Sequence, residues 1–227
     1  MRTLCIDIGG TGIKAIIADE GGVALTERGR IETPSPATPE AVLDVIAKLA
    51  SAQGDFDRVS VGFPGVVCER IIKRTHNLDE SFAGFDLGAA VEQRLGKPAR
   101  IANDALIQGL AVVEGKGFEV AITLGTGLGC GLYIDGKQAG CEIAHHPFRK
   151  RKTYEDLVGN AARRKVGNKK WNKRVRQIIE QLSETFNYRK LYIGGGNVKH
   201  LVREDLPENA QVVDNVAGLL GGIRLWV

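Results

Sequence analysis

The chain has 227 residues, of which 43% are hydrophobic and 26% charged, and a formal net charge of +4. This composition is typical of a globular protein with room for one large domain or two small lobes. No apolar run approaches the roughly 18 residues that span a bilayer. Asp7, Gly9 and Gly10 interrupt the first apolar stretch, which argues against a signal peptide. We therefore expect a cytoplasmic protein with no membrane partner.

The first strands are separated by glycine-rich turns. Apolar residues at 4–8 and 13–18 predict two strands, and the turn at 9–12 predicts that they form a β-hairpin. A third strand is expected over 23–31. The glycines of this region belong to a total of 29, and such clusters mark backbones that turn sharply or approach a ligand closely.

Two helices and two strands follow in this half. Thr-Pro at 38–39 starts a helix with apolar helical spacing that runs to about Ser51. A short buried strand is expected over 58–62. Asp86 caps the next helix, which Gly96 ends after Leu95, and a strand over 100–102 leads into a further helix.

The second half repeats the strand–glycine–strand pattern. Residues 120–124 and 130–134 predict strands around a glycine turn at 125–129, and LCIDIGGTGIKAII resembles VAITLGTGLGCGLY. A duplicated plan of two lobes, 1–103 and 104–227, is therefore expected. Helical spacing over 171–186, a strand at 191–193 and a terminal helix over 215–225, which returns to the N-terminal lobe, complete the second lobe.

Glycine-rich turns between strands expose N–H groups that can hold phosphate oxygens. In the first turn, Thr11 adds a hydroxyl and Asp7 can hold Mg²⁺, usually through water. The second turn, Gly125-Thr126-Gly127, has the same chemistry. Gly194, Gly195 and Gly196 leave room for a flat adenine or ribose. Each motif taken alone also fits an ordinary structural turn.

Taken together, six segments resemble the signature segments of the sugar kinase/actin/Hsp70 superfamily, and among its branches the ROK family. They occur in the expected order: DIGGTGIKA (7–15), VGFPGVV (61–67), ANDA (102–105), TLGTGLGCGL (123–132), LYIGGGN (191–197) and VAGLLGGI (216–223). The chain is most similar to the short polyphosphate/ATP glucokinase type of that family. The resemblance implies an α/β fold of two ribonuclease-H-like lobes, each a mixed sheet flanked by helices, with the active-site cleft between them.

The resemblance also implies site residues. Asp104 aligns with the general base, which accepts the sugar hydroxyl proton during phosphoryl transfer, although an N-capping aspartate is the ordinary alternative. Asn103 is expected to hydrogen-bond a sugar hydroxyl, and Asn77 matches a further sugar-binding asparagine. The donor site is implied to comprise Asp7, Gly9, Gly10, Thr11, Gly12, Lys14, Gly125, Thr126, Gly127, Gly194, Gly195 and Gly196.

Glu142 and His145 match the segment in which a glutamate and a histidine bind adjacent sugar hydroxyls. The sequence departs from the family pattern at Ala144, where glycine is usual, and at the additional His146. An exposed loop, or a metal site made of Glu142, His145 and His146, are the alternatives. Glu155 matches a later sugar-binding glutamate. The interval between the two family glutamates contains no cysteine, so we expect no zinc site.

A basic segment spans 149–176, with 12 lysine and arginine residues against two acids. It either binds a linear polyphosphate, through 149–152, Arg163, Arg164, Lys165, Lys169, Lys170 and Lys173, or is the solvated face of an amphipathic helix. The donor therefore stays open between ATP and polyphosphate, with Mg²⁺.

The rival hypotheses are regulators or sensors. ROK repressors carry a helix-turn-helix ahead of the kinase-like body, whereas the first hairpin here starts at residue 4, so we expect no specific nucleic-acid partner. A sugar sensor without catalysis is the second rival, against which Asp7 and Asp104 argue. Glucose and a homodimer are expectations from the resemblance.

Overall fold

The computed structural model describes residues 1–75, 78–149, 151–213 and 215–227, the side chains of 215–218 excepted. The chain forms two compact units. Unit 1 comprises Met1–Ala111 and Ala217–Val227, and unit 2 comprises Val112–Val216. The division into lobes 1–103 and 104–227 stays a prediction. Within the part of the chain that the structure describes, no helix is long and apolar enough to cross a membrane.

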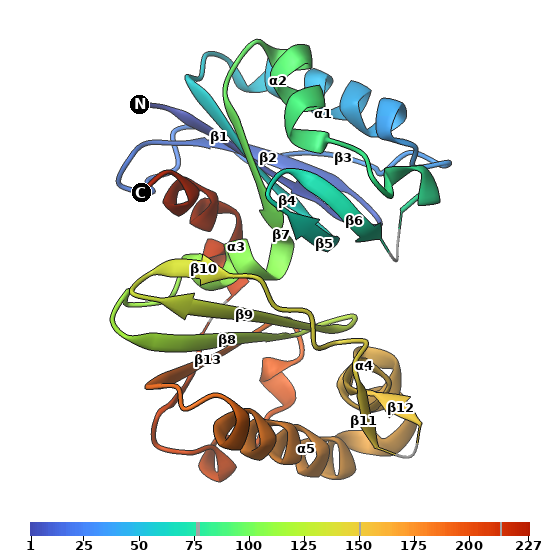
Figure 1. The fold of residues 1–227 in the computed structure, drawn as a ribbon, viewed down its shortest axis with the longest axis vertical. Helices are drawn as coiled ribbons and strands as arrows, with labels where there is room; N and C mark the ends of the chain where they lie inside the picture. The colour runs from blue at the N-terminus through green and yellow to red at the C-terminus, as the bar shows by residue number, and fades with distance from the viewer. Residues whose placement is uncertain (76–77, 150, 214) are drawn as a thin grey trace. The chain divides into compact units, whose positions relative to one another are not determined.

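Unit 1 is built on a five-stranded mixed sheet (Figure 1). The order is β3 (Gly29–Ile31), β2 (Ile13–Ala18), β1 (Thr3–Ile8), β4 (Arg58–Phe63) and β7 (Ala99–Asn103). The first three strands are antiparallel, whereas β1, β4 and β7 run parallel. The carboxyl ends of these three strands therefore share one edge of the sheet.

The predicted third strand, over 23–31, is wrong in its extent. Only Gly29–Ile31 pairs with β2 as a strand, and Ala24 makes an isolated bridge to Ala18. The Thr26 hydroxyl accepts the Ile17 N–H at 3.0 Å, so a side chain takes the place of a strand carbonyl and interrupts the ladder.

Helices and the chain terminus cover the two faces of this sheet. The core on one face joins the strands to α1 (Pro39–Gln53) and α2 (Leu87–Leu95). Thr38 and Asp86 are their N-caps and Gly96 ends α2 with φ 66°, as predicted. The remaining elements of the unit are a hairpin of β5 (Gly65–Cys68) and β6 (Ile71–Thr75), η1 (Glu80–Phe82) and α3 (Asp104–Leu110). The terminal segment η4 (Asn215–Trp226) belongs to unit 1 from Ala217 onward.

The terminal segment η4 is a 3₁₀-helix that contacts the other face of the sheet. Trp226 Nε1 donates to Ser60 Oγ at 2.9 Å, and this hydroxyl donates to the Gly222 carbonyl at 2.7 Å. The guanidinium groups of Arg58 and Arg100 lie 5.0 and 4.6 Å from the centroid of the indole ring. The chain end is therefore held by hydrogen bonds and cation–π contacts.

Unit 2 repeats the topology of unit 1, which confirms the duplicated plan. Its sheet has the order β10 (Lys137–Ala139), β9 (Leu128–Ile134), β8 (Phe118–Leu124), β13 (Lys190–Gly194) and β14 (Ala210–Val212). The pairs β10–β9 and β9–β8 are antiparallel, and β8–β13 and β13–β14 are parallel. Both sheets are thus mixed, and helices flank each of them.

The helical layer of unit 2 is longer than the sequence predicts. Helix α5 (Asn160–Thr185) begins well before residue 171 and contains a kink at Gly167, where φ is 77°. Beyond the kink, Trp171, Val175 and Leu182 are among the residues that bury one face against the sheet core. The smaller elements are β11 (Pro147–Arg149), β12 (Lys152–Thr153), α4 (Tyr154–Val158), η2 (Val198–His200) and η3 (Arg203–Asp205).

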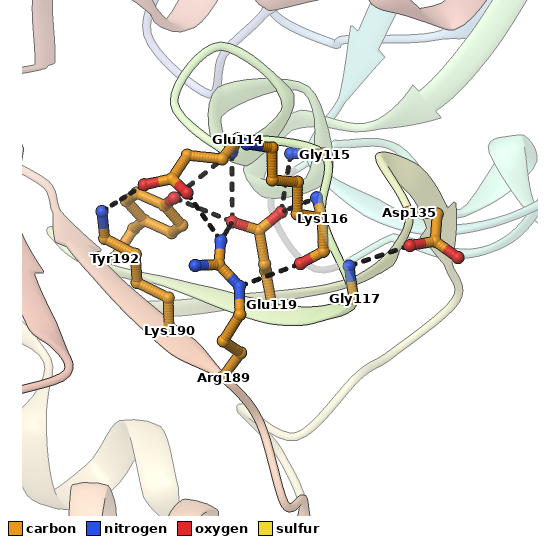
Figure 2. A network of polar contacts seen from close by, with 9 residues as sticks. All are labelled: Glu114, Gly115, Lys116, Gly117, Glu119, Asp135, Arg189, Lys190 and Tyr192. Atoms are coloured by element: carbon orange, nitrogen blue, oxygen red, sulfur yellow. Dashed lines mark hydrogen bonds and ion pairs between the residues drawn. The ribbon is translucent and has the colours of Figure 1, made fainter.

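A fully buried carboxylate organises the segment that leads into β8 (Figure 2). Glu119 accepts the N–H groups of Glu114, Gly115 and Lys116 at 3.1, 2.7 and 3.1 Å. It also accepts the Tyr192 hydroxyl at 2.8 Å and Arg189 Nη2 at 3.2 Å. Burial acts to raise its pKa, but the hydrogen bonds from Tyr192 and the three N–H groups outweigh burial and lower it.

Candidate functional site

The first glycine turn is fixed by hydrogen bonds of Gly9 and of the Thr11 carbonyl, whereas the N–H groups at its centre are unbonded within the part of the chain that the structure describes. The Gly9 N–H donates to the Gly12 carbonyl at 3.1 Å, and Arg30 Nη2 donates to the Thr11 carbonyl at 3.0 Å. Gly10 and Thr11 are exposed, and their N–H groups meet no acceptor among the described residues. These groups and the Thr11 hydroxyl therefore remain available to an anion.

Asp7 and Lys14 are direct cross-strand partners at the base of this turn. Lys14 Nζ lies 2.8 Å from Asp7 Oδ2, and the side chains are 34% and 24% exposed. The other oxygen, Oδ1, has no partner within the described parts of the chain. Such a half-open carboxylate fits Mg²⁺ held through water, because magnesium prefers oxygen ligands and keeps its hydration shell.

Asn103, rather than Asp104, caps helix α3. Its side-chain oxygen accepts the N–H groups of Ala105 at 2.9 Å and Leu106 at 3.3 Å, and its amide nitrogen donates to the Gly65 carbonyl at 3.0 Å. Asp104 is the first residue of the helix and accepts the Ala105 N–H at 2.9 Å. The capping role that could have explained an aspartate here thus belongs to its neighbour.

The sheet brings Asp7 and Asp104 to the same edge of unit 1. Asp7 pairs in register with Gly62, and Gly62 with Ala102. A Cβ on Gly62 would lie 3.5 Å from the Asp104 Cα, so the middle strand presents only backbone between the two acids. Ligands of open α/β sheets bind beyond the carboxyl ends of parallel strands, which is where both acids lie.

In unit 2, the predicted second phosphate loop packs against the third glycine motif. The Gly125 N–H donates to the Gly127 carbonyl at 3.0 Å. Asn197 donates from its side chain to the Gly125 carbonyl and from its backbone to the Leu124 carbonyl, both at 2.9 Å. Gly195 has φ 97°, and a Cβ there would lie 2.4 Å from the Leu124 carbonyl oxygen. Only glycine fits this approach.

Glu155 connects this loop with the segment of Glu142 and His145. Its Oε2 accepts the Leu128 N–H at 3.3 Å, and a Cβ on Gly127 would lie 1.9 Å from that oxygen. The Glu155 N–H donates to the Ala144 carbonyl at 2.9 Å. The second glycine loop, Glu155 and the backbone of the segment 142–145 are therefore linked by direct contacts.

Some predicted residues differ from expectation. Glu142 Oε1 accepts the Ala144 N–H at 2.9 Å, so this carboxylate shapes its own turn. No group of three or more His, Cys, Asp or Glu side chains able to hold a metal exists within the described residues, so the alternative of a Glu142, His145 and His146 metal site is wrong. Asn77 lies outside the residues that the structure describes.

Sequence reasoning missed three residues that hold the second loop. The Asn160 N–H donates to the carbonyls of Gly125 and Thr126 at 3.1 Å each. Arg163 donates to Asn197 Oδ1 at 3.2 Å and to Asn160 Oδ1 at 3.1 Å. Arg163 was expected in the basic stripe, but its guanidinium is committed to these asparagines. Asn160 and Arg163 are only three residues apart, but Asn197 and the loop that they hold are more than 30 residues away in the chain, which leaves no local sequence signal.

Part of the basic segment is free of ion pairs. Arg174 donates to the Leu157 carbonyl at 3.1 Å, and Arg176 pairs with Asp205 at 3.0 Å. Five exposed cations of α5 have no partner among the described residues: Arg164, Lys165, Lys169, Lys170 and Lys173. These are the cations that an external polyanion would meet.

The twin mixed sheets, each with a glycine loop between its first two strands, and the acids Asp7 and Asp104 at the strand ends of unit 1 define a member of the sugar kinase/actin/Hsp70 superfamily. The sequence profile described as "ROK family" matches residues 3–145. The chain belongs to the ROK family.

Comparisons with individual proteins agree. The chain is 30% identical to a polyphosphate glucokinase of Mycobacterium leprae, over 97% of this chain and 73% of the relative. The solved inorganic polyphosphate/ATP-glucomannokinase of Arthrobacter sp. strain KM superposes with a TM-score of 0.85 at 29% identity, covering 98% of this chain and 96% of that one. A ROK family glucokinase of Streptomyces griseus, solved with glucose and AMPPNP, shares the fold with a TM-score of 0.77 at 22% identity, over 99% of both chains.

Proposed function

We propose that the protein is a sugar kinase that transfers a phosphoryl group from ATP or polyphosphate to a hexose hydroxyl, converting glucose to glucose 6-phosphate. The observation that carries the proposal is that Asp104, the first residue of α3, lies at the same sheet edge as the turn at 9–12. The names of the polyphosphate glucokinase and glucomannokinase relatives support it.

In this mechanism Asp104 accepts the proton of the attacking sugar hydroxyl, because its carboxylate is favoured at the helix N-terminus. Glu142, His145 and Glu155, with Asn103 and Asn77, bind the remaining hydroxyls. A half-bonded carboxylate or an amide with a spare N–H can take part in a directional hydrogen bond with a diol.

The glycine turns orient the donor. The open N–H groups of Gly10 and Thr11 and the loop at 125–127 bind phosphate oxygens. Lys14 adds a positive charge, and the bare backbone of 194–196 accepts the nucleoside of ATP. Asp7 would hold Mg²⁺ through water, and a bound Mg²⁺ neutralises charge on the donor phosphates. The protein thus contributes mainly orientation and electrostatics.

For polyphosphate, we infer that the free cations of α5 extend the donor site. Lys169, Lys170 and Lys173 lie within one turn of the helix beyond the kink at Gly167, and all three are exposed. Several phosphates in a row demand several cations, and this surface supplies them without first breaking an ion pair.

We further infer a cytoplasmic homodimer.

A coupled assay that crosses a panel of hexoses with ATP and polyphosphate tests the proposal. The expected result is turnover with glucose; a chain that binds glucose but transfers no phosphoryl group from either donor would instead be a sensor. A triple Lys→Glu variant at 169, 170 and 173 should raise the KM for polyphosphate while that for ATP changes little. A triple Lys→Glu variant at the exposed Lys48, Lys97 and Lys137 is the control of equal charge change. Equal polyphosphate use by both variants would remove α5 from the donor site.

A further inference from the structure

The two cysteines nearest the second glycine loop face one another within unit 2. Cys130 lies in β9 and is 5% exposed, whereas Cys141 follows β10 and is half-buried against the same core. Their sulfur atoms are 3.8 Å apart, and both thiols are free. Neither cysteine is among the residues assigned above to the sugar site or to the donor site.

Strand register already places the two residues at a disulfide distance. Strand β10 pairs with β9 so that Lys137 opposes Ile134 and Ala139 opposes Leu132. Continued past Ala139, this register sets Cys141 opposite Cys130. Directly opposed residues of antiparallel strands have Cα atoms about 4.5–5.5 Å apart, within the range of about 4.4–6.8 Å found in disulfides. The sulfurs then have to close from 3.8 Å to about 2.05 Å, by rotation of the two side chains together with a shift of Cys141, which lies beyond the last paired residue of β10.

The two thiols differ in a way that assigns their roles. The contact with Cys130 lowers the pKa of the Cys141 thiol, whereas the contact with Cys141, together with burial, raises the pKa of Cys130. The thiolate is the reactive form, and Cys141 is also the more exposed of the two. Cys141 is therefore the thiol that meets an oxidant, and Cys130 is the resolving partner.

We propose that Cys130 and Cys141 form a reversible oxidation site that controls the adjacent segment 142–146. The Cys141 thiolate attacks one oxygen of hydrogen peroxide, the O–O bond breaks, and the released hydroxide takes up the thiol proton to become water. The Cys130 thiol then attacks the sulfenic sulfur of Cys141, the S–S bond forms, and the hydroxyl leaves with the second thiol proton as water. Two thiols lose two electrons, one peroxide gives two waters, and a dithiol reductant reverses the change.

The consequence follows from the neighbouring contacts and rests on the proposed function. Cys141 directly precedes Glu142, whose carboxylate accepts the Ala144 N–H, and the Ala144 carbonyl accepts the Glu155 N–H. Drawing Cys141 toward β9 therefore displaces the carboxylate that we assign to the sugar. Losing one charge-assisted hydrogen bond should raise the KM for glucose about tenfold.

The experiment treats the protein with hydrogen peroxide and maps its peptides by mass under non-reducing conditions. Amide hydrogen exchange of residues 140–146 and the KM for glucose are measured before and after dithiothreitol. We expect a Cys130–Cys141 crosslink, altered exchange in the segment and a raised KM, all reversed by the reductant. Cys141→Ser should abolish all three effects, and Cys68→Ser, which removes an exposed thiol elsewhere, should abolish none.

Three results would overturn the inference. They are oxidation of Cys141 to the sulfinic acid with Cys130 still free, a crosslink that leaves exchange of 140–146 unchanged, and undiminished peroxide sensitivity in Cys141→Ser. If the reduced protein does not phosphorylate glucose, the proposed function fails. The crosslink map and the exchange data still decide the oxidation site in that case.

Discussion

Glu119→Gln should destabilise unit 2 strongly for a single-atom change. The wild-type carboxylate is fully buried, with Oε1 accepting from Glu114, Arg189 and Tyr192, and Oε2 accepting from Gly115 and Lys116. The glutamine amide can accept from Glu114, Arg189 and Tyr192 through its oxygen only if its NH₂ group faces the N–H donors of Gly115 and Lys116. Two part-buried N–H donors, those of Gly115 and Lys116, are then left without acceptors. At about 1–3 kcal/mol each, we expect a loss of about 2–6 kcal/mol.

The pH dependence of the stability difference between wild type and Glu119→Gln is a second, independent test of this prediction. The folded pKa of Glu119 is lowered relative to the unfolded chain. Its contribution is therefore complete above the unfolded pKa of about 4.3 and is lost as the pH falls through the folded value. The stability difference between wild type and Glu119→Gln should be constant near neutral pH and shrink in acid.

Equilibrium urea unfolding, followed by tryptophan fluorescence, measures both effects. Trp171 is buried in unit 2, so a Trp226→Phe background makes the signal specific for that unit. Tyr192→Phe is the matched milder change, because it removes one donor to the carboxylate and should cost about 1 kcal/mol. A Glu119→Gln protein within about 0.5 kcal/mol of wild type, or a difference that does not shrink in acid, would refute the reasoning.

Two further substitutions test the packing of the site and of the chain end. Gly195→Ala should cost about 1–3 kcal/mol of stability, because its φ is positive and its Cβ meets the Leu124 carbonyl; Gly196→Ala, which has open space around it, should be close to neutral in the same unfolding assay. Trp226→Phe should destabilise unit 1 by about 1–2 kcal/mol, because it loses the bond to Ser60 and weakens two cation–π contacts; unchanged thermal unfolding would contradict this.

Local signals in the sequence predicted the parts of the fold that are set locally. The cap at Asp86 and the left-handed stop at Gly96 each depend on residues within one turn, and the structure has both. The repeated strand–glycine–strand pattern likewise predicted a duplicated plan, and the structure has two sheets with corresponding strand orders. The length of the strand predicted over 23–31 was overestimated. The Thr26 hydroxyl accepts the Ile17 N–H in place of a strand carbonyl, and such a contact cannot be predicted from the residue types alone.

Features that depend on distant partners could not be predicted in this way. Arg163 reads as one more cation of a basic helix, but it bonds Asn197, which is distant in the chain. The opposition of Cys130 and Cys141 depends on the register of the short, polar strand 137–139, which has no clear alternation. Asn103 rather than Asp104 caps α3 because the helix begins at Asp104, and a one-residue difference in a helix start cannot be predicted from the sequence.

Asp104→Asn tests whether this acid takes the hydroxyl proton. The amide keeps an oxygen to accept the Ala105 N–H but cannot act as a base. Glucose phosphorylation by Asp104→Asn and Asp104→Ala should fall in kcat by about 10²–10⁴-fold, while glucose affinity, measured by calorimetry, and urea stability stay close to those of wild type. A kcat within a few-fold of wild type in either variant would contradict the assignment.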